Sequence, residues 1–141
     1  MKIICFVTIT LLMFVSSLIA QDNNRRPTAV YADTKGISRM IELSNMAGDV
    51  SECAIAIKPY TGVIVKRVFD DDELTIIGIV LRDSKDERIY LNIDDDQISE
   101  MTRADLSNFS SFLSKGNRIK AWAYMCGVSG GVLFASKVKA L

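Results

Sequence analysis

The sequence predicts a mainly β fold, a five-stranded Greek-key barrel with one helix between its third and fourth strands. Three observations lead to this prediction. Residues 61–138 contain five runs rich in β-branched and aromatic residues, and several of these runs alternate apolar with polar residues, as strands do. Turn-forming clusters rich in aspartate or glycine separate neighbouring runs. Between the third and fourth runs, the apolar residues instead recur at helical spacing.

The first three predicted strands follow one another with short turns between them. They cover residues 62–69, 74–82 and 87–93, and the third alternates apolar and polar residues throughout. The acidic residues 70–73 end the first strand, and residues 83–86 form the turn before the third. We therefore expect the three strands to be neighbours in the barrel.

A helix and two further strands complete the predicted barrel. Thr102 is suited to cap the helix, with Asp105 three residues on in a position where Glu or Gln is usual. Gly116 is suited to end it. Residues 118–125 and 132–138 then return to a strand pattern. The apolar stripe of the helix consists of Leu106, Phe109, Phe112 and Leu113.

Three strands, a helix and two more strands is the order of the OB fold, a barrel that binds oligonucleotides and oligosaccharides. Residues 113–123, then Cys126 and Gly127, then a Gly-Gly turn into the last strand, resemble the end of small secreted bacterial OB-fold proteins, including the tRNA-anti-like family. The resemblance covers residues 61–139 and implies a binding barrel with no established catalytic residues. The fold alone does not determine the function.

The first residues have the layout of a secretory signal peptide. Residues 3–20 carry no charge, follow Lys2 and give way to a polar stretch that we expect to be a tether. Cleavage is expected after Ala20. The alternative is an uncleaved membrane anchor, because 18 apolar residues just reach the length of a marginal span. The predicted organisation is a signal peptide (1–20), an N-terminal tether and extension (21–60) and the barrel (61–141) of a secreted or periplasmic protein.

After cleavage two cysteines remain, Cys53 and Cys126. An even pair in an exported chain predicts a disulfide, and the alternative is two buried free thiols. The bond would hold the N-terminal segment against the barrel. Within that segment residues 53–57 look extended, whereas residues 37–44 fit either a helix or a short strand.

The composition excludes several kinds of chemistry. The chain has no histidine, which removes histidine-based triads, imidazole metal sites and the commonest general base. The acidic runs at 70–73 and 94–96 are contiguous at strand ends, so we expect solvated turns. A calcium site is the alternative, although neither run has the spaced pattern of a calcium-binding loop. We expect a protein that is not an enzyme and that has no cofactor and no metal.

The strongest functional signal is an outward-facing set of aromatic and cationic side chains. Alternation turns one side of the third and fourth strands toward solvent. Aromatic rings on such a surface can stack on bases or sugars. The alternative is that the N-terminal segment, tied by Cys53, covers the rings as a second small core. The predicted ligand-binding residues are Arg88, Tyr90 and Asn92 on the third strand and Lys120, Trp122 and Tyr124 on the fourth.

The charge of the chain disfavours a polyanionic ligand. The whole sequence has 17 Lys plus Arg and 17 Asp plus Glu, and loss of Lys2 with the signal leaves a net charge of −1. The acidic residues 70–73 between the first two strands would also repel phosphates. We therefore expect an exported, non-enzymatic OB-fold binding or interaction module whose ligand is a protein, a peptide or a glycan, with no membrane contact after signal cleavage. The alternatives are a single-stranded nucleic-acid-binding protein and a structural or envelope-stress protein without a discrete ligand.

Overall fold

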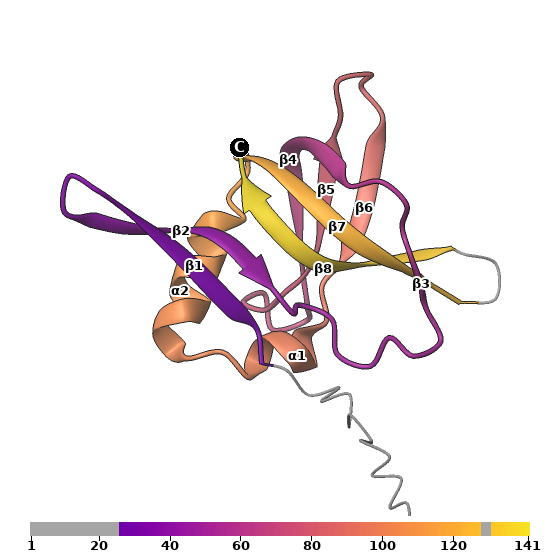
Figure 1. Cartoon of the computed structure of the whole chain (residues 1–141), viewed down its shortest axis with the longest axis horizontal. Helices are drawn as coiled ribbons and strands as arrows, with labels where there is room; N and C mark the ends of the chain where they lie inside the picture. Colours follow the sequence, from indigo (N-terminus) through magenta and orange to yellow (C-terminus); the bar gives the residue numbers. More distant parts are fainter. Residues whose placement is uncertain (1–25, 128–130) are drawn as a thin grey trace, which may run out of the picture.

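The structure is a computed structural model that describes residues 26–127 and 131–141 (Figure 1). The predicted signal peptide and most of the predicted tether lie outside the described residues. Among the described residues, no helix is both long and apolar enough to cross a membrane. The elements in chain order are β1 (Thr28–Thr34), β2 (Ile37–Ser44), β3 (Ala54–Ile55), β4 (Tyr60–Phe69), β5 (Ile76–Arg82), β6 (Arg88–Asn92), α1 (Asp95–Ser99), α2 (Arg103–Phe112), β7 (Arg118–Cys126) and β8 (Val132–Ala140).

Five of these strands close a barrel, which confirms the predicted fold class. β4, β5 and β6 are consecutive antiparallel neighbours, and β7 pairs antiparallel with both β4 and β8. The circle closes where β6 meets β8 in parallel. The last strand thus lies between the third and fourth barrel strands, as in a Greek-key OB-fold-like barrel.

The barrel interior is filled by the residues that the alternation pattern turns inward. On β6 the buried residue is Leu91, and on β7 the buried residues are Ile119, Ala121 and Ala123. Helix α2 covers part of this core with the buried side chain of Phe109 and its neighbours in the predicted stripe. The inward faces predicted for the third and fourth barrel strands are therefore confirmed.

The predicted helix starts and ends nearly as expected. The Thr102 hydroxyl accepts a hydrogen bond from the Asp105 backbone N–H at 3.1 Å and donates one to the Asp105 carboxylate at 2.9 Å. The helix ends at Phe112, and Gly116 follows with a φ of 95°, in the left-handed region that glycine adopts without strain. The second barrel strand begins at Ile76, two residues later than predicted, because a turn takes up the residues before it.

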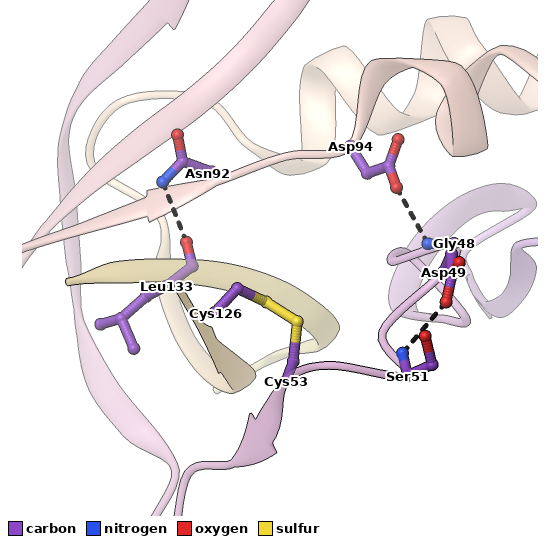
Figure 2. The surroundings of a disulfide bond; sticks show 8 residues. All are labelled: Gly48, Asp49, Ser51, Cys53, Asn92, Asp94, Cys126 and Leu133. Atoms are coloured by element: carbon purple, nitrogen blue, oxygen red, sulfur yellow. Dashed lines mark hydrogen bonds between the residues drawn. A yellow bond between two sulfur atoms is a disulfide. The ribbon is translucent and has the colours of Figure 1, made fainter. Parts of the chain in front are cut away.

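The short helix α1 was not predicted, because five residues are too few for a helical repeat to be visible. The sequence feature that indicates α1 is its N-cap residue, Asp94, which lies in the acidic run that we expected to form a turn. One carboxylate oxygen of Asp94 accepts from the Gln97 N–H at 3.2 Å and caps the helix, and the other accepts from the Gly48 N–H at 2.9 Å (Figure 2). Asp94 therefore joins the barrel to the segment that follows β2.

The N-terminal segment extends the barrel sheet at two edges. Residues 37–44, for which the sequence left helix and strand open, form strand β2, which makes a hairpin with β1. β2 pairs with the second half of β8, from Glu42 opposite Lys139 to Ser44 opposite Lys137. This edge is open because the short strand β6 pairs with β8 only near its start. The fully buried Leu43 shows that β2 and the barrel share one hydrophobic core.

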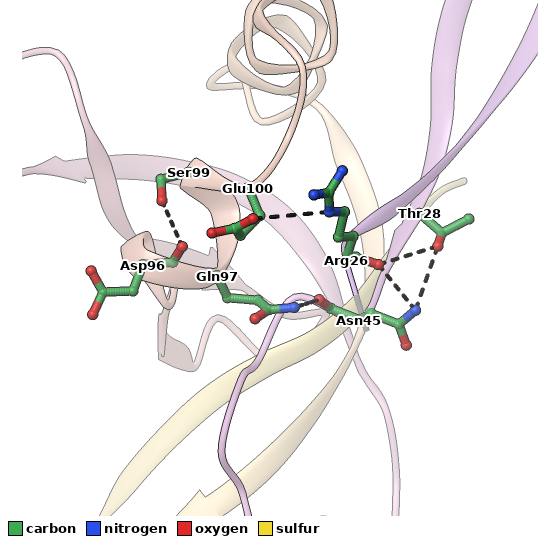
Figure 3. Close-up of polar contacts among 7 residues, drawn as sticks. All are labelled: Arg26, Thr28, Asn45, Asp96, Gln97, Ser99 and Glu100. Carbon is green, nitrogen blue, oxygen red and sulfur yellow. Dashed lines mark hydrogen bonds and ion pairs between the residues drawn. The ribbon is translucent and has the colours of Figure 1, made fainter. Parts of the chain in front are cut away.

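The base of the hairpin is attached to α1 (Figure 3). The Gln97 side-chain amide donates to the Asn45 carbonyl at 3.1 Å, and Arg26 lies 3.9 Å from the Glu100 carboxylate. The ion pair is exposed and contributes little to stability. The buried Gln97 is therefore the stronger of the two attachments.

Candidate functional site

The predicted disulfide between Cys53 and Cys126 is present, with the two Cα atoms 4.4 Å apart (Figure 2). The alternative of two free thiols is wrong. The bond joins the residue before β3 to the end of β7, and the two-residue strand β3 pairs antiparallel with β7. The disulfide thus fixes β3 as an added strand at the edge of the barrel.

Four side chains from four strands form one outward-facing row, which we call the outer row. Asn92 on β6 lies opposite Phe134 on β8, Phe134 lies opposite Tyr124 on β7, and Tyr124 lies opposite Ile55 on β3. Directly paired residues point to the same side of a sheet. Asn92 points outward because its neighbour Leu91 is buried in the barrel, so the other three point outward as well.

The outer row is polar at its β6 end, where Asn92 lies, and its other three members are aromatic or aliphatic. The Asn92 amide donates to the Leu133 carbonyl at 3.1 Å, which holds the ends of β6 and β8 together (Figure 2). Tyr124 and Phe134 are partly buried, whereas Ile55 is 71% exposed. The row therefore places aromatic and aliphatic side chains on the outside of the barrel.

A shallow hollow lies at the β6 end of the outer row. It has a volume of about 600 Å³, and the predicted residues Arg88, Tyr90 and Asn92 all line it together with Tyr60. The Tyr90 ring lies against the backbone of Gly78 on β5, since a Cβ atom placed there would come within 2.5 Å of the tyrosine hydroxyl. The structure thus brings the three predicted residues of the third barrel strand together around one concave surface.

Trp122 is partly buried and is flanked by cations. The amino groups of Lys120 and Lys137 each lie 5.3 Å from the centre of its ring, and Lys137 also pairs with the Glu42 carboxylate at 2.8 Å. Such contacts are attractive because the face of an aromatic ring is electronegative. The Trp122 ring therefore already contacts two amino groups of the protein itself.

Two strands of the N-terminal segment, β2 and β3, lie beside the barrel strands that carry the predicted rings. β3 pairs beside β7, and β2 pairs beside β8, so both strands widen the sheet at its edges. Tyr90 stays 42% exposed. The predicted site residues therefore fall into three groups: Arg88, Tyr90 and Asn92 line the hollow, Lys120 contacts the Trp122 ring, and Tyr124 belongs to the outer row.

Sequence reasoning missed Phe134 and Ile55. The signal for Phe134 was the alternation in the last barrel strand, but a bulge opposite Trp122 places both Ser136 and Lys137 between buried residues and obscures the pattern. Ile55 carried no local signal, because its position depends on pairing with a strand about 70 residues away.

The acidic run at 70–73 forms an exposed turn, as predicted. The Asp72 carboxylate accepts from the N–H groups of Leu74 and Thr75, both at 2.8 Å, and from the Thr75 hydroxyl at 2.5 Å. These hydrogen bonds, above all the one from the Thr75 side chain, lower the pKa of Asp72. Across residues 26–127 and 131–141, no group of three or more histidine, cysteine or acidic side chains is placed to hold a metal ion.

Comparison of the chain with protein-family models, curated proteins and solved structures gives no match. The resemblance to small secreted OB-fold proteins therefore stays a hypothesis, and the functional argument depends on the surface of this chain.

Proposed function

We propose that the protein is an exported, non-enzymatic binding module that holds a protein segment or peptide on the outer row and in the hollow beside it. The observation that supports this proposal best is the alignment of Tyr124, Phe134 and Ile55 across three adjacent strands. Val132, which lines the hollow, is 42% exposed and adds to the apolar surface. Contiguous exposed apolar surface on a small domain is typical of protein interaction sites.

A peptide fits this surface better than a glycan does. Sugars stack on open aromatic faces, whereas the most exposed members of the surface include the aliphatic side chains of Ile55 and Val132. Aliphatic surface gains most from contact with the apolar side chains of another protein. Arg88 and Asn92 at the hollow supply the few polar contacts that would orient such a ligand.

Export is supported by the disulfide together with the predicted signal peptide. Disulfides persist in oxidising compartments and are rare where cellular thiols stay reduced. The bond between Cys53 and Cys126 is compatible with a secreted or periplasmic location.

Single-stranded nucleic acid is the second candidate ligand. Lys120 and Lys137 beside Trp122 favour it, because grooves for single strands combine cations with aromatic rings. Two observations disfavour it: Lys137 already forms an ion pair with Glu42, and the turn at 70–73 is acidic and exposed. Binding of a twelve-residue oligothymidylate should then be weak and should fall steeply with salt.

Peptide selection followed by titration tests the proposal. A library of random twelve-residue peptides would be panned against the oxidised protein, and selected peptides titrated by the fluorescence of Trp122, the one tryptophan in the sequence. Tyr124→Ala should weaken binding by about tenfold or more, as expected for an aromatic anchor. Phe69→Ala is the matched control, because Phe69 is an exposed aromatic residue outside the outer row.

The three alternatives give different outcomes. Equal affinity of the selected peptides for the wild type and for Tyr124→Ala would contradict the outer row as the site. Tight, salt-sensitive binding of the oligothymidylate with no selected peptide would favour the nucleic-acid-binding protein. Absence of both would favour a structural protein without a discrete ligand.

A further inference from the structure

A second concave surface lies between the hairpin and the barrel, away from the outer row. β2 pairs with β8 only from Glu42 onward, and the preceding residues of β2 pair only with β1. The hairpin therefore diverges from the end of β8 and projects away from the barrel, with α2 beside it (Figure 1). A pocket of about 490 Å³ opens where β2, α2 and the end of β8 separate.

A hydrogen bond joins the hairpin to α2, two elements that line this pocket. The Tyr31 hydroxyl donates to the Asp105 carboxylate in the first turn of α2. Burial, reinforced by the negative charge of Asp105, raises the pKa of Tyr31 to about 12, so the hydroxyl keeps its proton at neutral pH. β1, which pairs with β2 along the hairpin, is thus attached to α2.

The base of the pocket is apolar. Met40 from β2, Phe112 from α2 and Ile119 from β7 all line the pocket, and all three are buried. Pockets of about 300–1,000 Å³ with an apolar lining and a few polar groups are typical of small-ligand sites. This pocket lies within that range.

Two arginines give the pocket a positive rim. Arg39 on β2 and Arg118 at the start of β7 both line it, and both are exposed. In the part of the chain that the structure describes, neither guanidinium makes an ion pair or a hydrogen bond. The lining contains no aspartate or glutamate.

We propose that this pocket binds an amphipathic organic anion, with its apolar body on Met40, Phe112 and Ile119 and its carboxylate or phosphate group at Arg39 and Arg118. Guanidinium groups bind both anions through charge-assisted hydrogen bonds. The site shares no residue with the outer row or its hollow, so it is independent of the proposed peptide-binding function.

A matched pair of dyes tests the charge requirement in the full chain. 8-Anilinonaphthalene-1-sulfonate is an amphipathic anion, and N-phenyl-1-naphthylamine is its uncharged counterpart. The double variant Arg39→Gln, Arg118→Gln should bind the anionic dye about tenfold or more weakly, and the uncharged dye with unchanged affinity. Arg82→Gln is the control, because Arg82 is exposed on β5, lines neither the pocket nor the hollow, and should leave both affinities unchanged when replaced.

Displacement then identifies the head group and the position. Dodecanoate and dodecyl phosphate are added to the dye complex, and the better competitor shows whether carboxylate or phosphate is preferred. Ser111→Phe, which fills the pocket from the exposed face of α2, should weaken both dyes. Equal binding of the anionic dye by the wild type and the double variant would overturn the proposal. Failure of both competitors, or full binding by Ser111→Phe, would overturn it as well.

Discussion

Removal of the disulfide should destabilise the protein in two separate ways. The bond closes a loop between residues that are 73 positions apart. In the chain-entropy model, a loop of that length restricts the unfolded chain enough to stabilise the fold by about 4 kcal/mol. The double variant Cys53→Ser, Cys126→Ser should lose about that much unfolding free energy in urea titrations. With an unfolding entropy of about 2 cal/mol/K per residue, the melting temperature should fall by about 15–20 °C.

The same variant should also release β3 locally. β3 pairs with β7 through two residues only, and Ile55 is 71% exposed, so little apolar burial holds it. The Ala56 N–H donates to the Ala123 carbonyl at 3.0 Å and should exchange slowly with solvent in the oxidised protein. In the variant, that amide should exchange fast.

Hydrogen exchange provides an internal control. The Met46 N–H donates to the Ser136 carbonyl at 3.0 Å, and Met46 is fully buried, so this amide should stay protected when β3 detaches. A loss of less than about 1 kcal/mol would refute the entropic estimate. Retained protection at Ala56 would refute the inference that the disulfide, and not the pairing of β3, holds the segment in place.

Three further predictions concern export, the hairpin and the contact with α2. Mass spectrometry of the protein from its native host should find an N-terminus at Gln21, whereas an intact chain in the membrane fraction would support the anchor. Leu43→Ala should cost about 2–5 kcal/mol in denaturant titrations, since Leu43 is fully buried, and a loss near zero would mean that the hairpin is independent of the core. Tyr31→Phe should cost about 1 kcal/mol at neutral pH through the lost hydrogen bond to Asp105. The pKa of Tyr31 is raised from 10.0 to about 12, so the stabilising effect of its protonated hydroxyl is complete below pH 10 and is lost as the pH rises through 12. Between pH 10 and 12, the free energy of unfolding should therefore fall more steeply in the wild type than in Tyr31→Phe.

The sequence by itself determined the elements whose signals are local. Residues 118–125 alternate because one side of β7 faces the core, and the stripe of α2 recurs because one side of the helix covers the barrel. The cap at Thr102 was visible because a cap and its helix are adjacent in the chain. The disulfide followed from the number of cysteines, which needs no knowledge of the fold.

Only the tertiary structure decided which of these elements lie side by side. Residues 37–44 pair with β1 along their whole length, and their last three residues also pair with the second half of β8, with Glu42 opposite Lys139 nearly one hundred residues later in the chain. The outer row, the hollow and the arginine-rimmed pocket all depend on such distant pairings. Periodicity tells which side of a strand is apolar, but the partner of a strand is chosen by the burial and hydrogen bonds gained when distant segments meet. The candidate binding surfaces of this protein were therefore set by contacts that no local pattern contains.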